Sequence, residues 1–138
     1  MAAFPVEKLS PLPGKLSGEK GNASIAVPMR PFNLLVEGRD ESVSTSLRLD
    51  FIDLPLTDFV ELAGRTFDFP KNPEDGYIDG SIYIYHAHHL ADVTRIKFGS
   101  ISMEGIAVEM DVELLFEIEG LGDYRNTHLI LATALRHG

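Results

Sequence analysis

The clearest pattern along the chain is an alternation of apolar and polar side chains. From Val43 to Phe51, apolar or threonine side chains alternate with serine, arginine and aspartate. Successive side chains of a β-strand point to opposite faces of a sheet, so this alternation predicts a strand with one buried face. Four later segments have the β-branched and aromatic enrichment that is typical of strands: residues 77–86, 93–102, 106–119 and 127–136.

One short helix is expected at about residues 56–63. Apolar side chains recur there at helical spacing, Thr57 can cap the first turn and Gly64 can end the last one. The strand segments follow one another with short gaps, which favours antiparallel pairing because parallel neighbours need a long crossover. We therefore predict a mainly β fold, an antiparallel sandwich or curved sheet of about 7–9 strands with one short helix.

The first 22 residues differ from the rest in composition. Prolines and glycines recur among lysine, glutamate and serine, and each interrupts a regular period. We expect residues 1–22 to form a flexible or draped N-terminal segment. Residues 23–138 are then a single β-rich domain, in keeping with a chain of 138 residues.

Side-chain parity predicts how residues 93–102 pair with 106–119. The even-numbered residues are apolar in both segments, and charged side chains lie between them. A three-residue loop, Met103 to Gly105, keeps both apolar faces on one side of the sheet. In that register Lys97 faces Asp111 and Arg95 faces Glu113.

Net charge and cysteine content exclude several functions. The formal charge is -9, so the chain is expected to bind neither nucleic acid nor anionic membranes. Cysteine is absent, which excludes thiol nucleophiles, thiolate metal sites and disulfides. No signal-peptide pattern and no apolar run of about 18 residues occurs, so a cytoplasmic location is expected.

Acidic residues concentrate in one part of the chain. From Phe98 to Tyr124 there is no Lys or Arg, and there are seven carboxylates: Glu104, Glu109, Asp111, Glu113, Glu117, Glu119 and Asp123. Glu109, Asp111 and Glu113 share one strand face, about 7 Å apart. Paired carboxylates at such spacing can hydrolyse glycosides, but basic residues expected across the hairpin favour a solvated ladder of ion pairs.

Two tyrosines are candidates for a binding surface. Tyr83 and Tyr85 lie on the strand face opposite Ile82 and Ile84. Tyrosine supplies rigid area with a polar tip, which protein interfaces use. The alternative is a second buried face, covered by the N-terminal segment or by the helix.

Three of the five histidines fall within four positions, in the segment His86-Ala87-His88-His89. If the strand continues there, His86 and His88 share a face and are spaced to bind a transition metal. The third ligand would come from elsewhere in the chain, from among His128, Asp92 and Asp123. The alternatives are hydrogen-bonded residues at the rim of the sheet, since Ile82 and Ile84 share that face, and a pH-responsive interface.

Three functional hypotheses remain open. The first is a non-enzymatic binding module, without a cofactor, whose acidic face and Tyr83/Tyr85 surface engage a protein, for example as an immunity-like inhibitor of a basic protein. Its partner-binding residues are Tyr83, Tyr85, Glu109, Asp111, Glu113 and Glu117. The second is a metal-binding protein or metal-dependent enzyme that uses His86, His88 and His128. The third is a structural subunit that associates with copies of itself through exposed strands, and a homodimer is compatible with all three.

Overall fold

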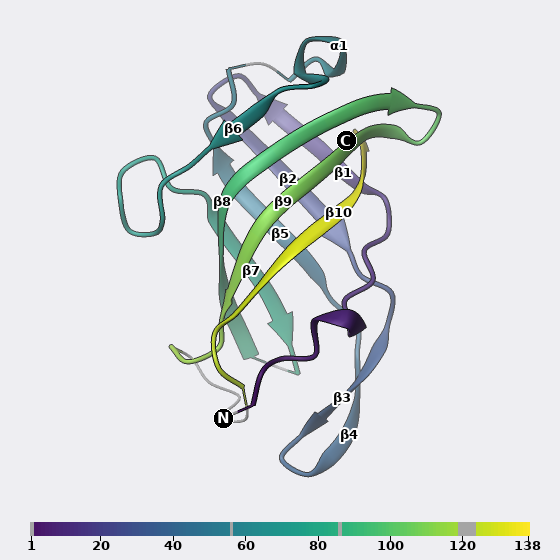
Figure 1. Ribbon diagram of the computed structural model, residues 1–138, viewed down its shortest axis with the longest axis vertical. Helices are drawn as coiled ribbons and strands as arrows, with labels where there is room; N and C mark the ends of the chain where they lie inside the picture. Colours follow the sequence, from purple (N-terminus) through teal and green to yellow (C-terminus); the bar gives the residue numbers. More distant parts are fainter. Residues whose placement is uncertain (1, 56, 86, 119–123) are drawn as a thin grey trace.

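A computed structural model describes residues 2–55, 57–85, 87–118 and 124–138 (Figure 1). The first part contains a 3-10 turn, η1 (Val6–Lys8), and the strands β1 (Gly14–Glu19), β2 (Asn22–Pro28), β3 (Phe32–Val36), β4 (Arg39–Val43) and β5 (Ser46–Ile52). After them come α1 (Phe59–Leu62), β6 (Thr66–Asp68), β7 (Asp79–Ile84), β8 (Ala87–Ser102), β9 (Gly105–Leu115) and β10 (Thr127–His137). The predicted mainly β fold with one short helix is confirmed.

Seven strands close into a barrel. Their order is β8-β7-β5-β2-β1-β10-β9, and β9 pairs with β8 to complete the circle. All of these pairings are antiparallel except β1 with β10, where Gly14 lies opposite Leu135. The short β6 adds to the outside edge of β8, and β3 with β4 forms a separate two-stranded hairpin. Closure stabilises the predicted curved sheet because it leaves few strand edges unpaired.

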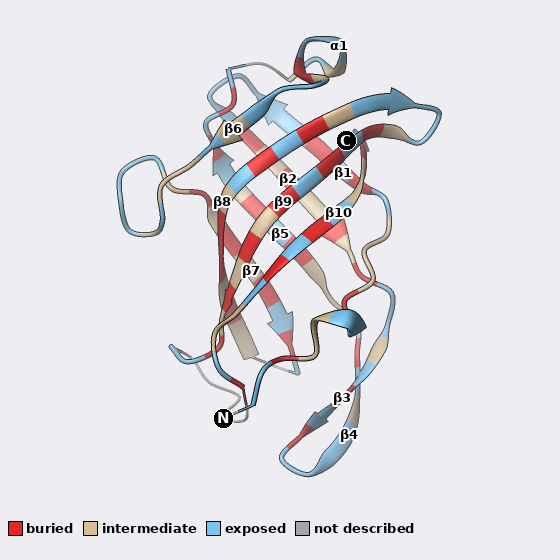
Figure 2. Ribbon diagram, viewed as in Figure 1, coloured by how far each residue is buried: buried red, intermediate tan, exposed pale blue. Residues whose placement is uncertain are grey.

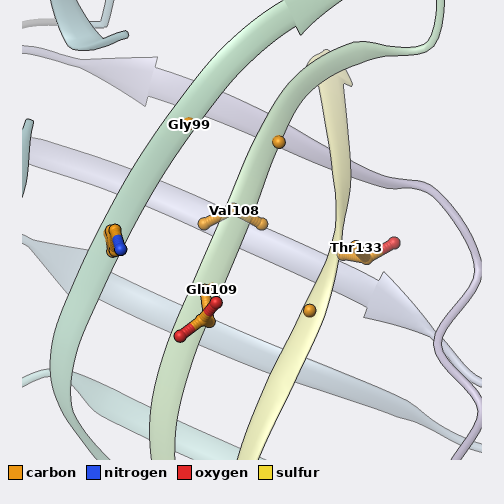
Figure 3. Close-up of a pocket in the computed structure, with 7 residues that line it drawn as sticks. Gly99, Val108, Glu109 and Thr133 are labelled. Atoms are coloured by element: carbon orange, nitrogen blue, oxygen red, sulfur yellow. The ribbon is translucent and has the colours of Figure 1, made fainter. Parts of the chain in front are cut away.

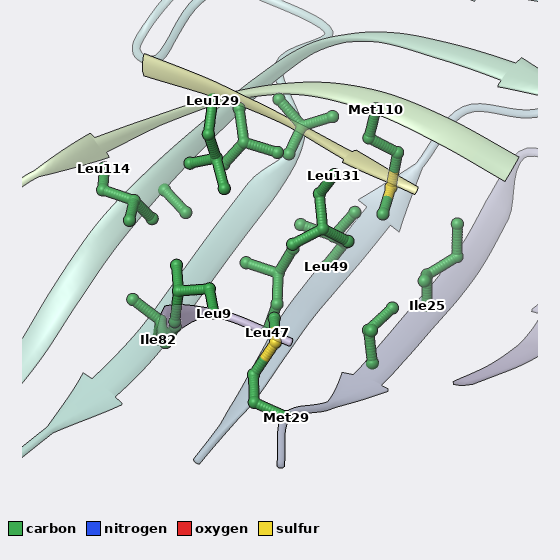
Figure 4. Packing of buried hydrophobic residues seen from close by; sticks show 14 of the residues in the cluster. Leu9, Ile25, Met29, Leu47, Leu49, Ile82, Met110, Leu114, Leu129 and Leu131 are labelled. Carbon is green, nitrogen blue, oxygen red and sulfur yellow. The ribbon is translucent and has the colours of Figure 1, made fainter. Parts of the chain in front are cut away.

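The barrel interior is filled by apolar side chains from every wall. Buried and exposed residues alternate along β8, β9 and β10 in Figure 2, as expected for strands with one face inward. Figure 4 shows Leu47 and Leu49 of β5 pointing toward Leu131 of β10 inside the barrel. Each of these leucines is at most 4% exposed. Burying one such side chain contributes roughly 1.5–3 kcal/mol, so the interior provides the main driving force for folding.

The predicted loop between β8 and β9 is wrong. Ser102 pairs with Gly105, which leaves a turn of Met103 and Glu104 only. Lys97 consequently faces Glu109 and Arg95 faces Asp111, so each partner lies two residues away from the expected one.

A bulge in β8 explains why the apolar faces still match. The register shifts between Phe98 and Ile101, where Gly99 and Ser100 together lie opposite a single residue of β9. The extra residue restores the parity that a two-residue turn alone would have broken. A second shift lies between Val93 and Arg95. Such bulges bend a strand, which fits β8 to the curved wall of the barrel.

The helix is shorter than expected. Asp58, and not Thr57, is its N-cap, and its side chain accepts a hydrogen bond of 3.0 Å from the Val60 amide. Gly64 follows the helix with a φ of +78°, which favours glycine. Residue 56, the expected start, lies outside the described residues.

The N-terminal residues pack against the barrel. Phe4 is 2% exposed, and its ring stacks on Phe116 with 4.8 Å between centroids. Leu9 is also buried, and residues 14–19 form β1, one of the strands of the barrel wall. The expected boundary after residue 22 therefore falls at the start of β2, within the β1–β2 hairpin.

Candidate binding surface

Tyr83 projects from the outer wall of the barrel. Its neighbours Ile82 and Ile84 point inward and are almost fully buried, whereas Tyr83 is 58% exposed. Across the β7–β8 hairpin Tyr83 pairs with His88, and the two rings meet edge to face at 4.9 Å. Tyr85 lies just past the end of β7, with a φ of +47°, and is 37% exposed. Neither tyrosine therefore belongs to a second buried face.

Apolar side chains extend from Tyr83 across the neighbouring strands. Leu90 of β8 pairs with Leu115 of β9, and both belong to the outer wall. Together with His88 and Ile118 they line a hollow of about 220 Å³. Ile118 is 63% exposed. We call this set, Tyr83, His88, Leu90, Leu115 and Ile118, the Tyr83 patch.

A second hollow lies between Tyr83 and β4. Its volume is about 270 Å³, and it is lined by Glu41, Ser42, Val43, Ser44, Tyr83 and Tyr85. Glu41, Ser42 and Val43 belong to β4, and Ser44 follows it. Tyr83 thus lines the hollow beside β4, and it contacts His88, which lines the other hollow.

The acidic row continues directly into the Tyr83 patch. Glu109, Asp111 and Glu113 alternate along the outer side of β9, and the next outward position is Leu115. Glu117 lies beyond the strand, where its carboxylate accepts a hydrogen bond of 2.8 Å from the Asn126 amide. That bond holds Glu117 in the connection to β10.

Basic side chains lie close to only part of the acidic row. The Glu113 carboxylate lies 3.8 Å from the Lys71 amine, and Asp111 lies 3.6 Å from Nε2 of His128. Arg95 bonds instead to Asp68 at 2.9 Å, and this hydrogen bond raises the pKa of the arginine. Within the described ranges no ion pair involves Glu109. On the outer wall Glu109 is exposed and Asp111 and Glu113 are half-buried, an arrangement suited to ionic association.

A smaller hollow lies farther along the same wall. Figure 3 shows Gly99, Glu109 and Thr133 around it, on β8, β9 and β10. Its volume is about 180 Å³, because Gly99, Ala107 and Ala132 present little or no side chain there. The Thr133 hydroxyl donates a hydrogen bond to the carbonyl of Leu12, so this hydroxyl already has a partner in the N-terminal segment.

The histidines of the predicted metal site lie in different surroundings. His86 and Asp123 fall outside the described residues. His88 belongs to the Tyr83 patch, and His128 pairs with Asp111. β7 ends at Ile84 and β8 begins at Ala87, so His88 belongs to β8 and not to a continuation of β7.

The other candidates have structural neighbours. His89 is fully buried beside Phe116, with 4.9 Å between ring centroids. Asp92 is 7% exposed and accepts a hydrogen bond of 3.1 Å from the Asn72 amide. In the described part of the chain no group of three or more His, Cys, Asp or Glu could hold a metal ion. A metal site involving His86 stays a prediction.

Sequence reasoning missed Leu90, Leu115 and Ile118. One signal was available for Leu115, which is the apolar residue among the outward, otherwise acidic positions from 109 to 117. Leu90 carried no such signal, because the bulge in β8 between Val93 and Arg95 changes the parity of that strand.

In the part of the chain that the structure describes, no helix is long and apolar enough to cross a bilayer. No protein-family model, curated protein or solved structure matches the chain.

Proposed function

We propose that the chain is a non-enzymatic binding module that engages a basic protein through the Tyr83 patch and the acidic row. The observation that carries this proposal is their continuity on β9, where Leu115 follows Glu113 on the same outer side. Protein interfaces typically have an apolar, aromatic centre and a polar rim. Tyrosine is among the residues that most often dominate their binding energy.

Charge supports a basic partner. The chain carries a net charge of -9. Among the described residues the Glu109 carboxylate forms no ion pair. Carboxylates at the rim steer a cationic partner toward the surface and raise the association rate. The Tyr83 patch then supplies the apolar contacts that slow dissociation. Inhibition of a basic protein is one form such binding could take.

The test compares partner capture by matched variants. The wild type, Tyr83→Ala, a Glu109→Lys/Asp111→Lys double variant and a Glu19→Lys/Asp53→Lys control are immobilised and exposed to lysate. Both double variants change the net charge equally, but Glu19 and Asp53 are exposed near the barrel end that carries the β1–β2 turn. We expect one basic protein to be retained by the wild type and the control only.

The captured protein is then purified and its kinetics measured. Tyr83→Ala should weaken binding by about tenfold or more, mainly through faster dissociation. The association rate should fall about tenfold or more between roughly 0.05 and 0.5 M salt. Equal retention by all four proteins, or an association rate independent of salt, would refute the proposal.

A further inference from the structure

The β3–β4 hairpin extends from the barrel, and its two outer edges differ (Figure 1). Val36 pairs with Arg39 across a turn of Glu37 and Gly38, both of which have positive φ. In such a two-residue hairpin the pair beside the turn exchanges both backbone hydrogen bonds, and every second pair repeats this. Asn33 and Leu35 of β3, and Asp40 and Ser42 of β4, therefore direct their backbone groups outward.

The outer edge of β3 is capped by side chains. The Lys8 amine donates to the Asn33 carbonyl at 2.6 Å. The Tyr124 hydroxyl donates to the Leu35 carbonyl, also at 2.6 Å. Both outward carbonyls of this strand therefore have partners, so a further strand would have to displace these two side chains.

The outer edge of β4 has no such cap. Among the described residues no hydrogen bond engages the outward backbone groups of Asp40 or Ser42, and both residues are exposed. This edge borders the hollow of about 270 Å³ whose other wall is Tyr83 and Tyr85. An extended segment beside β4 would place alternate side chains against those rings, because strand side chains alternate between faces.

The charges on β4 indicate which kind of segment can pair with its open edge. Of the charged residues in β4, Asp40 and Glu41 are acidic and Arg39 is basic. Pairing with the β4 of a second copy would bring the same carboxylates together, and like charges across a strand pair are destabilising. A segment that carries lysine or arginine would place opposite charges there.

We propose that β4 receives an extended, lysine- or arginine-bearing segment of the partner as an additional strand, with alternate side chains packed on Tyr83 and Tyr85. Main-chain hydrogen bonds supply affinity in this mode of recognition, and side-chain contacts supply specificity. The proposal rests on the proposed function and specifies which part of the partner is bound and how.

The probe is an acetylated, amidated octapeptide of alternating lysine and valine, titrated into the full chain at low salt. Amide hydrogen exchange is followed by NMR. We expect saturable binding that slows exchange at Asp40 and Ser42. Two further peptides test the mechanism, one N-methylated at every second residue and one with glutamate in place of lysine. Each should bind at least tenfold more weakly.

Two proline variants test the edge within the protein. Ser42→Pro removes an outward N–H of β4, and Asn33→Pro removes the outward N–H of the residue paired with it on β3. Neither removes a β3–β4 hydrogen bond. We expect only Ser42→Pro to lose the peptide at least tenfold. If Ser42→Pro fails to fold, the N-methylated peptide decides the question.

Several outcomes would overturn strand addition. They are no saturable binding, equal binding of the N-methylated peptide, unprotected Asp40 and Ser42 amides, and concentration-dependent dimerisation of the chain that Ser42→Pro abolishes. If the captured basic protein binds Ser42→Pro as well as wild type but not Tyr83→Ala, the proposed function stands and strand addition fails. If Tyr83→Ala also binds normally, the proposed function fails.

Discussion

Gly80 offers a sharp test of the barrel packing. It lies in β7, where it pairs with Leu49 of β5 on one side and Ala91 of β8 on the other. A Cβ added at Gly80 would overlap the Ala91 carbonyl oxygen and come within 3.1 Å of a Leu49 methyl. The φ of Gly80 is outside the left-handed region, so Gly80→Ala tests packing alone.

The cost can be worked out from these contacts. The obstructing atom is a backbone oxygen, which a side-chain rotation cannot move, so β7 and β8 must separate locally. Overpacking of this kind typically costs about 1–3 kcal/mol, and weakening one ladder hydrogen bond adds about 1 kcal/mol. Alanine also lowers the conformational entropy of the unfolded chain, which offsets roughly 0.4–1 kcal/mol of this loss. We expect a net loss of about 2 kcal/mol, or a Tm lowered by roughly 6–10 °C.

Gly99→Ala is the matched control. Gly99 lies at the hollow shown in Figure 3, and its added Cβ would meet only the Ala107 side chain at 3.1 Å and the Ala107 carbonyl oxygen at 3.8 Å. The free energy of unfolding should change by less than about 0.5 kcal/mol. Urea unfolding and calorimetry measure both variants. Equal stabilities, or a Gly80→Ala loss below about 0.5 kcal/mol, would refute the inward packing of β7 against β8.

Two further results are expected. Phe116→Ala should lower the free energy of unfolding by about 3–5 kcal/mol in urea titrations, because Phe116 is fully buried. Ile118→Ala, at a position 63% exposed, should leave that free energy almost unchanged. Similar losses in the two variants would contradict the burial of Phe116. Added zinc should not change the Tm of the wild type or of a His88→Ala/His128→Ala variant, because these two histidines have separate neighbours. A zinc-induced rise in Tm that the variant loses would establish a metal site. Elemental mass spectrometry is the check.

Side-chain parity identified much of the surface and the core. The alternation from Val43 onward predicted that Leu47 and Leu49 would be buried, and both are. It failed at Phe51, which has a φ of +57° and is exposed. It also placed Glu109, Asp111 and Glu113 along one outward side of a strand. Parity succeeds here because the direction of each side chain is a property of the local backbone, which the sequence sets within a few residues.

The pairings that close the barrel depend on the tertiary structure. Gly14 and Leu135 lie at opposite ends of the chain, yet they pair in the single parallel contact of the barrel. No local pattern marks the bulge at Gly99 and Ser100, because an extra residue is favourable only where the facing strand and the curvature of the wall require it.

The candidate site divides in the same way. The sequence by itself determined that Tyr83 would lie on the strand face opposite Ile82 and Ile84, and that Glu109, Asp111 and Glu113 would share one face. It left open whether the face of Tyr83 was a second buried one. Only the tertiary structure decided that Leu115 lies beside Leu90, and that Lys8 and Tyr124 cap β3 while β4 keeps an open edge. Alternation is a short-range property of the backbone, whereas neighbours across strands are chosen by the packing and hydrogen bonding of the whole barrel.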